Sequence, residues 1–293
     1  MSEIVLHTDL PFAQRLSRGK VRDIYRLGDD LLLVTTDRIS AFDVVMGQGI
    51  PNKGCVLTAL SKFWFQKLAH IIPNHFLSDD VDAWHDVPPA HRATLAGRSM
   101  RCRLAKPLPV EWVVRGYLTG SGFNDYKKSG AVSGVALPPG LEHASKIDPP
   151  ILTPSTKAET GHDLPISFET VCETVGADVA GRARDAALRL YTTARDYAAE
   201  RGIVIADTKF EFGLVGDELI LIDECLTPDS SRFWPAEEVA PGKKPTSFDK
   251  QRLRDYLATL AWNKEPPPPP LPADVIADTA KTYHDIYQRL IAP

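Results

Sequence analysis

The sequence predicts an α+β fold, because strand-like segments dominate its first third while helices and strands alternate irregularly afterwards. In the first hundred residues, two runs rich in Leu, Val and Ile lie on either side of a turn at residues 28–30. The second half contains amphipathic helical segments and an apolar hairpin over residues 202–224. No strand–helix unit recurs at a fixed interval, which disfavours a regular parallel α/β sheet.

Helices are predicted where apolar residues recur at helical spacing. Leu57 and Trp64 belong to one such stripe, and its aromatic residues are expected in the core. Gly202 ends the longest helical segment, and Ser247 can cap another at its N-terminus. A strand-rich piece over residues 98–118 leads out of the first half. The four predicted helices cover residues 54–70, 178–202, 247–262 and 273–291.

Composition indicates an ordinary soluble globular protein. Of the 293 residues, 43% are hydrophobic and 25% charged, and no apolar run is long enough to span a membrane. The start of the chain lacks the basic and then apolar pattern of a signal peptide. A net charge of −4 disfavours a nucleic-acid partner, whose phosphates would require a basic surface. The four cysteines have no metal-ligand spacing, so we expect free thiols and a cytoplasmic location.

The hairpin over residues 202–224 carries the strongest chemical signal. Side chains alternate along a strand, so Asp207, Lys209 and Glu211 share one face. If a three- or five-residue loop joins the two strands, Asp223 lies opposite Glu211 on that face. Two carboxylates so close repel each other unless a proton or a cation lies between them. With Lys209 beside them to attract an anionic ligand, the pattern predicts a magnesium–nucleotide site.

Two alternatives stay open for this hairpin. An alternating charged face is commonly the solvated side of an antiparallel sheet. A two-residue loop would also send Asp223 to the opposite face and weaken the prediction of a metal site.

Two segments earlier in the chain supply groups that bind anions. Gly19, Lys20 and Arg22 stand where one strand turns toward the next, although the segment matches neither common glycine-rich phosphate motif. Arg115 is followed by the sequence TGSG, which offers the Ser121 hydroxyl and glycine amides for a phosphate or carboxylate. The alternative for this second segment is a structural pair between Arg115 and Glu111 beside a glycine-rich turn.

Further cations follow in the second half. Lys157 lies among hydroxyl residues in a proline-rich loop, and Arg232 comes just after the hairpin. Lys250 and Arg254 are four residues apart on one helical face. So many cations near a carboxylate-rich hairpin, in an acidic protein, favour a cleft that binds several anionic groups.

Motifs over most of the chain resemble one family, SAICAR synthetase (phosphoribosylaminoimidazole-succinocarboxamide synthase), in its longer variant. The segments PVEWVVRGYLTGS and IADTKFEFG resemble the two signature patterns of the family. Further matching segments are GKVRDIY, TTDRISAFD, PNKG, TPSTKAE, LIDECLTPDSSRFWP and SFDKQRLRDYL.

The resemblance implies a ligase that joins L-aspartate to the carboxylate of carboxyaminoimidazole ribotide (CAIR), with ATP as cosubstrate and Mg²⁺ as cofactor. It also implies a two-lobed architecture related to protein kinases, with ATP in a cleft between the lobes. We then expect a β-rich nucleotide-binding lobe over residues 1–112. An α/β lobe over residues 113–293 would hold the ribotide and metal sites and the C-terminal helices. A monomer with small-molecule substrates is expected.

The same resemblance implies roles for individual residues. Catalytic roles fall to Lys209, Lys20 and Asp207, with Asp207 either accepting a proton from the aspartate ammonium or serving as a structural hydrogen-bonding group. The residues that would bind ATP are Gly19, Lys20, Arg22, Lys106, Leu108, Glu211 and Asp223, and the last two would also bind Mg²⁺. The residues that would bind the ribotide are Arg115, Ser121, Arg232 and Arg254. Those expected near the aspartate or the ribotide carboxylate are Ser40, Asp43 and Lys53.

The residue chemistry fits this reaction. A carboxylate does not react with an amine at neutral pH, because its oxygen is a poor leaving group. Phosphoryl transfer from ATP would convert the carboxylate into an acyl phosphate that the aspartate amine can attack. Catalysis of the first step would then consist of positioning and charge neutralisation, which Lys20, Lys209 and Mg²⁺ can supply.

Two other functions compete with the ligase. A small-molecule kinase on the same scaffold would phosphorylate a hydroxyl, but the excess of cations around Arg115, Arg232 and Arg254 favours a bulky phosphorylated cosubstrate. A regulatory module that binds nucleotide without catalysis is disfavoured because Lys20 and Lys209 are present together with both carboxylates of the hairpin.

Overall fold

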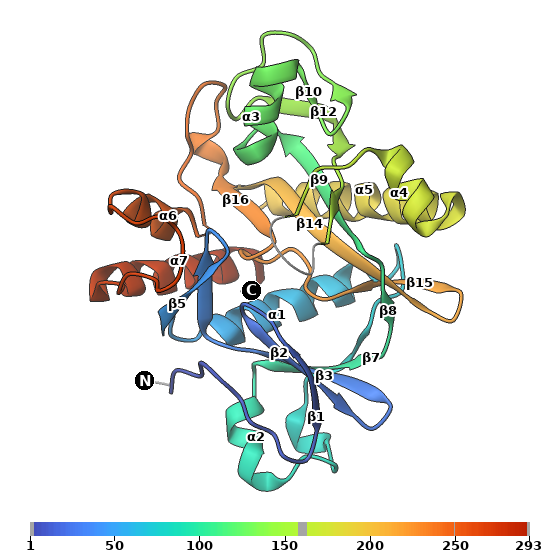
Figure 1. The fold of residues 1–293 in the computed structure, drawn as a ribbon, viewed down its shortest axis with the longest axis vertical. Helices are drawn as coiled ribbons and strands as arrows, with labels where there is room; N and C mark the ends of the chain where they lie inside the picture. The colour runs from blue at the N-terminus through green and yellow to red at the C-terminus, as the bar shows by residue number, and fades with distance from the viewer. Residues whose placement is uncertain (1–2, 158–162, 249, 292–293) are drawn as a thin grey trace. The chain divides into compact units, whose positions relative to one another are not determined.

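The computed structural model describes residues 3–157, 163–248 and 250–291 (Figure 1). Strands and helices are mixed irregularly along the chain, which confirms the α+β class. The described residues form two compact units. The first unit lies within residues 1–63, 75–104 and 249–293, and the second lies within 64–74 and 105–248. In the part of the chain that the structure describes, no helix is both long and apolar enough to cross a membrane.

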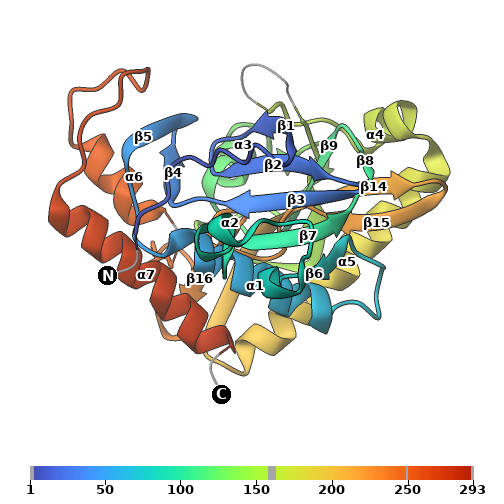
Figure 2. The same ribbon diagram turned by 90° about the horizontal axis from the view of Figure 1, so that it is seen from below.

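An antiparallel sheet forms the centre of the first unit. Its β2 and β3 are joined by a two-residue turn, in which Gly28 takes a positive φ of 62° that suits glycine. One face of the sheet buries Tyr25, Leu32 and Val34 against Trp84 and Leu95. Figure 2 shows the strands side by side in the order β1 (Gln14–Arg18), β2 (Arg22–Leu27), β3 (Asp30–Thr35), β7 (Ser99–Arg103) and β6 (Phe76–Ser78).

The C-terminal helices belong to the first unit, together with a two-stranded ribbon, β4 (Arg38–Ala41) and β5 (Val44–Gly49). Leu253 of α6 (Gln251–Ala258) and Val275 of α7 (Ala273–Ile291) share an apolar cluster with Ile39 and Met46 of the ribbon. These compact units therefore differ from the predicted lobes 1–112 and 113–293, because apolar contact joins residues 250–291 to the start of the chain. Which unit serves which ligand stays a prediction.

The predicted helices have close counterparts, with one difference. The helices α1 (Lys53–Lys67), α5 (Ala177–Ala199) and α7 match the predicted ranges to within three residues at each end. The prediction that Ser247 caps a helix was wrong. The helix α6 begins only at Gln251, and the Ser247 hydroxyl donates instead to the carbonyl of Phe233 at 3.4 Å. Two shorter helices are α2 (Pro89–Leu95) in the first unit and α4 (Phe168–Val175) in the second.

The second unit is built around the long strand β14 (Ile203–Val215), which occupies the middle of a larger sheet (Figure 1). It pairs with β9 (Val110–Tyr117) on one side and with β16 (Ser231–Pro235) on the other. Farther along, it forms the predicted hairpin with β15 (Glu218–Ile222). The remaining strands of this sheet are β8 (Lys106–Pro107), β12 (Lys146–Leu152) and β13 (Ser155–Thr156). The helix α3 (Gly120–Ser129) and a small ribbon of β10 (Ala131–Val132) and β11 (Val135–Ala136) follow β9.

Helix α5 covers the apolar face of this sheet, and one contact sets how closely it approaches. The Tyr191 hydroxyl of α5 donates to the Ile205 carbonyl of β14 at 2.7 Å. It passes directly over Gly116 of β9, where an added Cβ would lie 1.9 Å from the hydroxyl oxygen. Glycine is therefore required at this position by space rather than by backbone conformation.

We predict that Gly116→Ala destabilises the protein by about 2–4 kcal/mol, because the methyl group would force α5 away from the sheet. Gly181→Ala is the matched control, since this glycine lies within α5 with nothing within 4 Å of an added Cβ. It should stabilise by up to ~1 kcal/mol through helix propensity. Denaturant unfolding of both variants checks this, and equal effects of the two substitutions would contradict the proposed contact.

Candidate functional site

One face of β14 carries buried charge, and the other face is apolar. Trp112 and Phe210 are fully buried on the apolar side. On the charged side, Asp207 is 4% exposed, Glu211 5% and Arg115 of the neighbouring strand 8%. Charged residues on a solvated face would be far more exposed than this. This face is therefore not the solvated side of the sheet, and its function stays a prediction.

The register of the sheet brings the charges of β9 and β14 together. Asp207 pairs with Arg115, and Lys209 pairs with Val113, so alternate residues of both strands point to the same side. The Lys209 ammonium donates to Glu111 at 2.7 Å and to Glu211 at 2.7 Å. Glu111 therefore pairs with Lys209 rather than with Arg115, contrary to the alternative of a local pair within β9.

The charge of Lys209 is strongly stabilised. Burial alone lowers the pKa of its ammonium, but attraction to Glu211, Glu111 and Asp223 outweighs burial and raises the pKa above its ordinary value. Burial also raises the pKa of Glu111, and Lys209 opposes that rise. The ammonium of Lys209 thus neutralises a group of carboxylates that would otherwise repel one another.

The predicted pairing of Glu211 with Asp223 is wrong. The hairpin has a two-residue loop, Gly216 and Asp217, and Glu211 pairs with Ile222. The loop is short because Gly216 adopts a positive φ of 59°, which suits a tight hairpin turn. Asp223 follows the last residue of β15, and its own φ of 65° breaks the alternation of the strand. Its carboxylate nevertheless contributes to the raised pKa of Lys209.

Lys157 joins this cluster from the loop after β13. Its ammonium forms an ion pair with Glu211, and the Ser155 hydroxyl donates to Glu111 at 3.3 Å. Pairing of β13 with β9, which sets Ser155 opposite Glu111, accounts for both contacts. The last residues of the TPSTKAE motif, 158–159, lie outside the described residues. The sequence singled out Lys157 as an anion-binding residue without linking it to Glu211, because a two-residue strand gives no periodic signal.

Two arginines flank Asp207 from opposite sides. Arg115 of β9 donates to its carboxylate at 2.9 Å, and Arg232 of β16 forms a second ion pair with the same oxygen. Arg115 also donates to Thr153 at 2.9 Å and to Ser121 at 3.3 Å. Burial lowers the pKa of the Arg115 guanidinium, Asp207 opposes this, and the charge of Arg232 adds to the lowering. Two guanidiniums on one carboxylate leave net positive charge for an anionic ligand.

Glycines at the start of α3 make room for these arginines. Gly120 has a φ of 57°, and a Cβ there would lie 2.7 Å from Nη2 of Arg232. A Cβ on Gly122 would lie 3.1 Å from Nε of Arg115. Thr119 precedes the helix without capping it, because its hydroxyl contacts His143 instead at 2.9 Å. The two guanidiniums and the Ser121 hydroxyl thus lie together at the start of α3, and that they bind an anion stays a prediction.

In the first unit, the sequence-predicted residues separate into exposed and buried groups. Lys20 is half-exposed and forms an ion pair with Asp43. Arg22, Ser40 and Lys53 are buried, and the Lys53 ammonium lies 5.5 Å from the centre of the Tyr283 ring. Lys20 is thus the more accessible of the two cations at this turn, because Arg22 is only 7% exposed.

Asp43 belongs to a strained turn. Asp43 and its neighbour Phe42 take positive φ values of 65° and 52° in the turn between β4 and β5. Such values are uncommon for residues other than glycine, and they cluster at functional sites. Phe42 is held edge-on against Trp262 at 6.4 Å, and Lys264 lies over its ring. These contacts hold the turn from which Asp43 forms its ion pair with Lys20.

Three further residues were predicted to bind ligands: Lys106, Leu108 and Arg254. Lys106 is exposed on β8, and the amide of the buried Leu108 donates to the Phe212 carbonyl at 2.9 Å. Arg254 lies on α6 in the first unit, whereas Arg115 and Arg232 belong to the second.

The α+β fold is shared with a class of ATP-dependent ligases. The arginines around Asp207 and the carboxylates around Lys209 lie on the same side of one strand. The chain belongs to the SAICAR synthetase family, whose model matches residues 15–269.

Individual members of this family are similar to the chain over nearly its whole length. A phosphoribosylaminoimidazole-succinocarboxamide synthase of Geobacter metallireducens is 54% identical over 99% of this chain and 98% of its own length. The structure of a SAICAR synthase from Saccharomyces cerevisiae complexed with SAICAR superposes with a TM-score of 0.89. It is 40% identical and covers 100% of this chain and 98% of that one. A SAICAR synthetase in complex with ADP, at 24% identity and a TM-score of 0.69, covers 94% of this chain and 97% of its own and shows the shared fold.

We predict that Lys209→Met destabilises the protein by about 3 kcal/mol at pH 7.5, because three neighbouring carboxylates lose their common cation. Their pKa values should rise in the folded state. A carboxylate with a raised folded pKa takes up a proton on folding, so stability increases as the pH falls. The deficit relative to the unsubstituted protein should therefore shrink to roughly half at pH 5.5.

Denaturant unfolding at both pH values measures this effect. Lys128→Met, at an exposed lysine near the end of α3, is the control and should change stability by less than about 0.5 kcal/mol at either pH. A deficit for Lys209→Met that does not depend on pH would show that the carboxylates do not share this lysine.

Proposed function

We propose that the charged face of β14 is where this chain, as a member of the SAICAR synthetase family, joins L-aspartate to the carboxylate of CAIR at the expense of ATP. The observation that carries the proposal is the burial of charges of both signs along one strand. Such burial costs free energy unless each charge is paired, and the pairs here leave cations directed at two neighbouring anion sites.

The arginine cradle is proposed to hold the ribotide. Arg115, Arg232 and Ser121 offer hydrogen-bond donors to a phosphate, and the first amides of α3 add the positive end of a helix dipole. Asp207 holds both guanidiniums, which supports the structural role for it over that of proton acceptor. Arg254 is proposed as a further contact to the ribotide.

The lysine–carboxylate cluster is proposed to hold Mg²⁺ with the ATP phosphates. The donor set fits the ion, because Mg²⁺ prefers one or two carboxylates completed by phosphate oxygens and water. Glu211 and Asp223 would supply these carboxylates, and both act on the charge of the same lysine. Among the described residues there is no group of three His, Cys, Asp or Glu side chains that could hold a metal by themselves. This favours an ion that arrives with the nucleotide and neutralises part of its charge.

Further ATP contacts complete the proposal. Gly19, Lys20 and Arg22 are proposed to contact phosphates, and Lys106 and Leu108 to contact the adenine. Ser40, Asp43 and Lys53 are proposed to lie near the aspartate or the reacting carboxylate. The full burial of Lys53 gives that residue the weakest support.

The reaction is proposed to pass through an acyl phosphate. A carboxylate oxygen of CAIR attacks the γ-phosphorus, the bond to the β-phosphate oxygen breaks, and ADP leaves. The aspartate amine, after losing a proton, attacks the acyl carbon, and phosphate leaves with the former carboxylate oxygen. Lys209, charged because of its carboxylates, would stabilise the negative charge that both steps place on oxygen.

The setting of the enzyme is also part of the proposal. None of the four cysteines forms a disulfide within the described residues, which supports the reducing cytoplasm as its location. The substrates are small molecules, and we propose that the enzyme is a monomer.

An oxygen-labelling experiment tests the acyl-phosphate route. With ¹⁸O in both oxygens of the reacting carboxylate of CAIR, each released phosphate should carry a single labelled oxygen, and the other should remain in the amide product. Mass spectrometry of the phosphate measures this. Phosphate without label would rule out phosphoryl transfer to the carboxylate.

A pair of crossed substitutions tests the assignment of the two anion sites. Arg232→Met should raise the KM for CAIR about tenfold or more, because a charge-assisted hydrogen bond is lost, while the KM for ATP stays within roughly twofold. Asp223→Asn should lower kcat by a factor on the order of 10² and raise the Mg²⁺ concentration required, with little change in the KM for CAIR. Steady-state kinetics checks both, and each variant is the control for the other. Parallel effects on both substrates would mean that the two sites are misassigned.

A further inference from the structure

We propose that Arg38 is a positioning residue that shapes the backbone turn over residues 19–21 into a receptor for the ATP phosphates. This inference rests on the proposed function, in which Gly19 and Lys20 contact those phosphates. It assigns a role to a buried arginine that lies outside every site described above.

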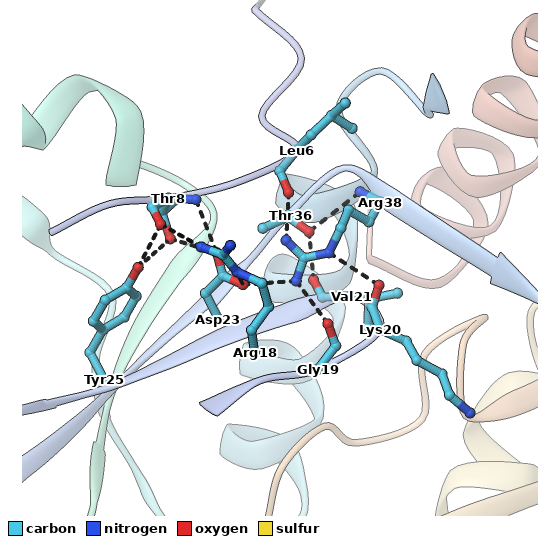
Figure 3. A network of polar contacts seen from close by, with 10 residues as sticks. All are labelled: Leu6, Thr8, Arg18, Gly19, Lys20, Val21, Asp23, Tyr25, Thr36 and Arg38. Atoms are coloured by element: carbon cyan, nitrogen blue, oxygen red, sulfur yellow. Dashed lines mark hydrogen bonds and ion pairs between the residues drawn. The ribbon is translucent and has the colours of Figure 1, made fainter. Parts of the chain in front are cut away.

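The contacts of Arg38 converge on this turn (Figure 3). Its guanidinium donates to the Gly19 carbonyl at 3.0 Å and to the Lys20 carbonyl at 3.2 Å. A third hydrogen bond reaches the carbonyl of Leu6. The next carbonyl of the turn, that of Val21, accepts from the Thr36 hydroxyl at 2.8 Å and from the Thr36 amide at 2.9 Å. Three consecutive carbonyls are therefore held by Arg38 and Thr36.

A buried carboxylate keeps the guanidinium in place. Asp23 accepts from Arg38 at 2.9 Å, from Arg18 at 3.1 Å and from the Thr8 amide at 2.9 Å. The side chain of Asp23 has no exposed surface, and that of Arg38 is 4% exposed. Burial raises the pKa of Asp23, but the hydrogen bonds from Arg38 and Thr8 outweigh it and hold the pKa below its ordinary value. The Asp23 carboxylate thus neutralises the charge of Arg38, and the remaining N–H groups of the guanidinium donate to backbone carbonyls.

The captured carbonyls explain why the turn would suit an anion. A peptide carbonyl that faced a triphosphate would repel it, whereas an amide would attract it. With the three carbonyls turned toward Arg38 and Thr36, the amides of Lys20 and Val21 donate no hydrogen bond within the described residues. Figure 3 also shows the Lys20 side chain extending away from the Arg38 network. In this turn the carbonyls of residues 19–21 are therefore occupied, whereas the amides of Lys20 and Val21 stay available to a ligand.

Only an arginine meets this geometry. Its planar fork reaches the two carbonyls of the turn, the Leu6 carbonyl and Asp23 at once. A lysine keeps the charge but has three donors on one nitrogen and cannot span these acceptors. Arg38→Lys should therefore retain the ion pair with Asp23 and lose the shape of the turn.

Steady-state kinetics of the full-length enzyme tests the proposal. Arg38→Lys should raise the KM for ATP about tenfold or more, with the KM values for CAIR and aspartate within roughly twofold. Arg98→Lys is the matched control, because Arg98 is equally buried and is paired with the buried Asp37 at 3.0 Å in the same unit. It should lose comparable stability and keep the KM for ATP.

Two further variants keep the test decisive. If Arg38→Lys does not fold, Thr36→Val replaces it and should raise the KM for ATP about threefold, since the Val21 carbonyl loses the hydroxyl bond and keeps only the bond from the amide of residue 36. An unchanged KM for ATP in the folded variant would overturn the proposal.

Lys20→Met distinguishes a failure of the role of Arg38 from a failure of the proposed ATP site. A raised KM for ATP with Lys20→Met and none with Arg38→Lys overturns only the role of Arg38, whereas an unchanged KM with both overturns the ATP assignment as well.

Discussion

The structure of the site depends on the placement of one ammonium among buried carboxylates. Lys209 lies in the middle of β14 and contacts Glu111 of the neighbouring strand as well as Glu211 of its own. Without that cation, the face could not hold its acids in a buried position, because uncompensated buried charge is far more costly than a paired one. The same lysine, kept charged by its neighbours, is the cation that we propose to act on the phosphate groups of ATP. Stability and chemistry therefore rest on one electrostatic arrangement.

Departures from regular backbone geometry complete this arrangement at its edges. Asp223 takes a left-handed conformation just after β15 ends, and its charge adds to the raised pKa of Lys209. Gly120 and Gly122 let two arginines approach the start of α3, where a side chain would collide with either guanidinium. In the first unit, Arg38 holds a turn whose shape no strand pairing would impose. Each exception places a charged group that periodic structure alone would leave elsewhere.

Much of this could be predicted from the sequence where periodicity decides the outcome. The long helix ending near Gly202, the charged face of β14 and the grouping of Arg115 with Ser121 follow from spacing alone. The loop length of the hairpin could not, because Gly216 and Asp217 suit a two-residue turn while nearby residues also permit longer ones. The contacts of Glu111 with Lys209 and of Lys157 with Glu211 depend on pairing between distant strands, which local sequence does not specify. Nor does local sequence reveal that helices α6 and α7 pack with the β4–β5 ribbon.

The most direct measurement is a crystal structure of the enzyme with Mg²⁺, ADP and CAIR bound together. The proposed arrangement requires Mg²⁺ on Glu211 and Asp223, and an anionic group of the ribotide on Arg115 and Arg232. A metal bound by other residues, together with a ribotide that leaves the arginine cradle empty, would contradict it.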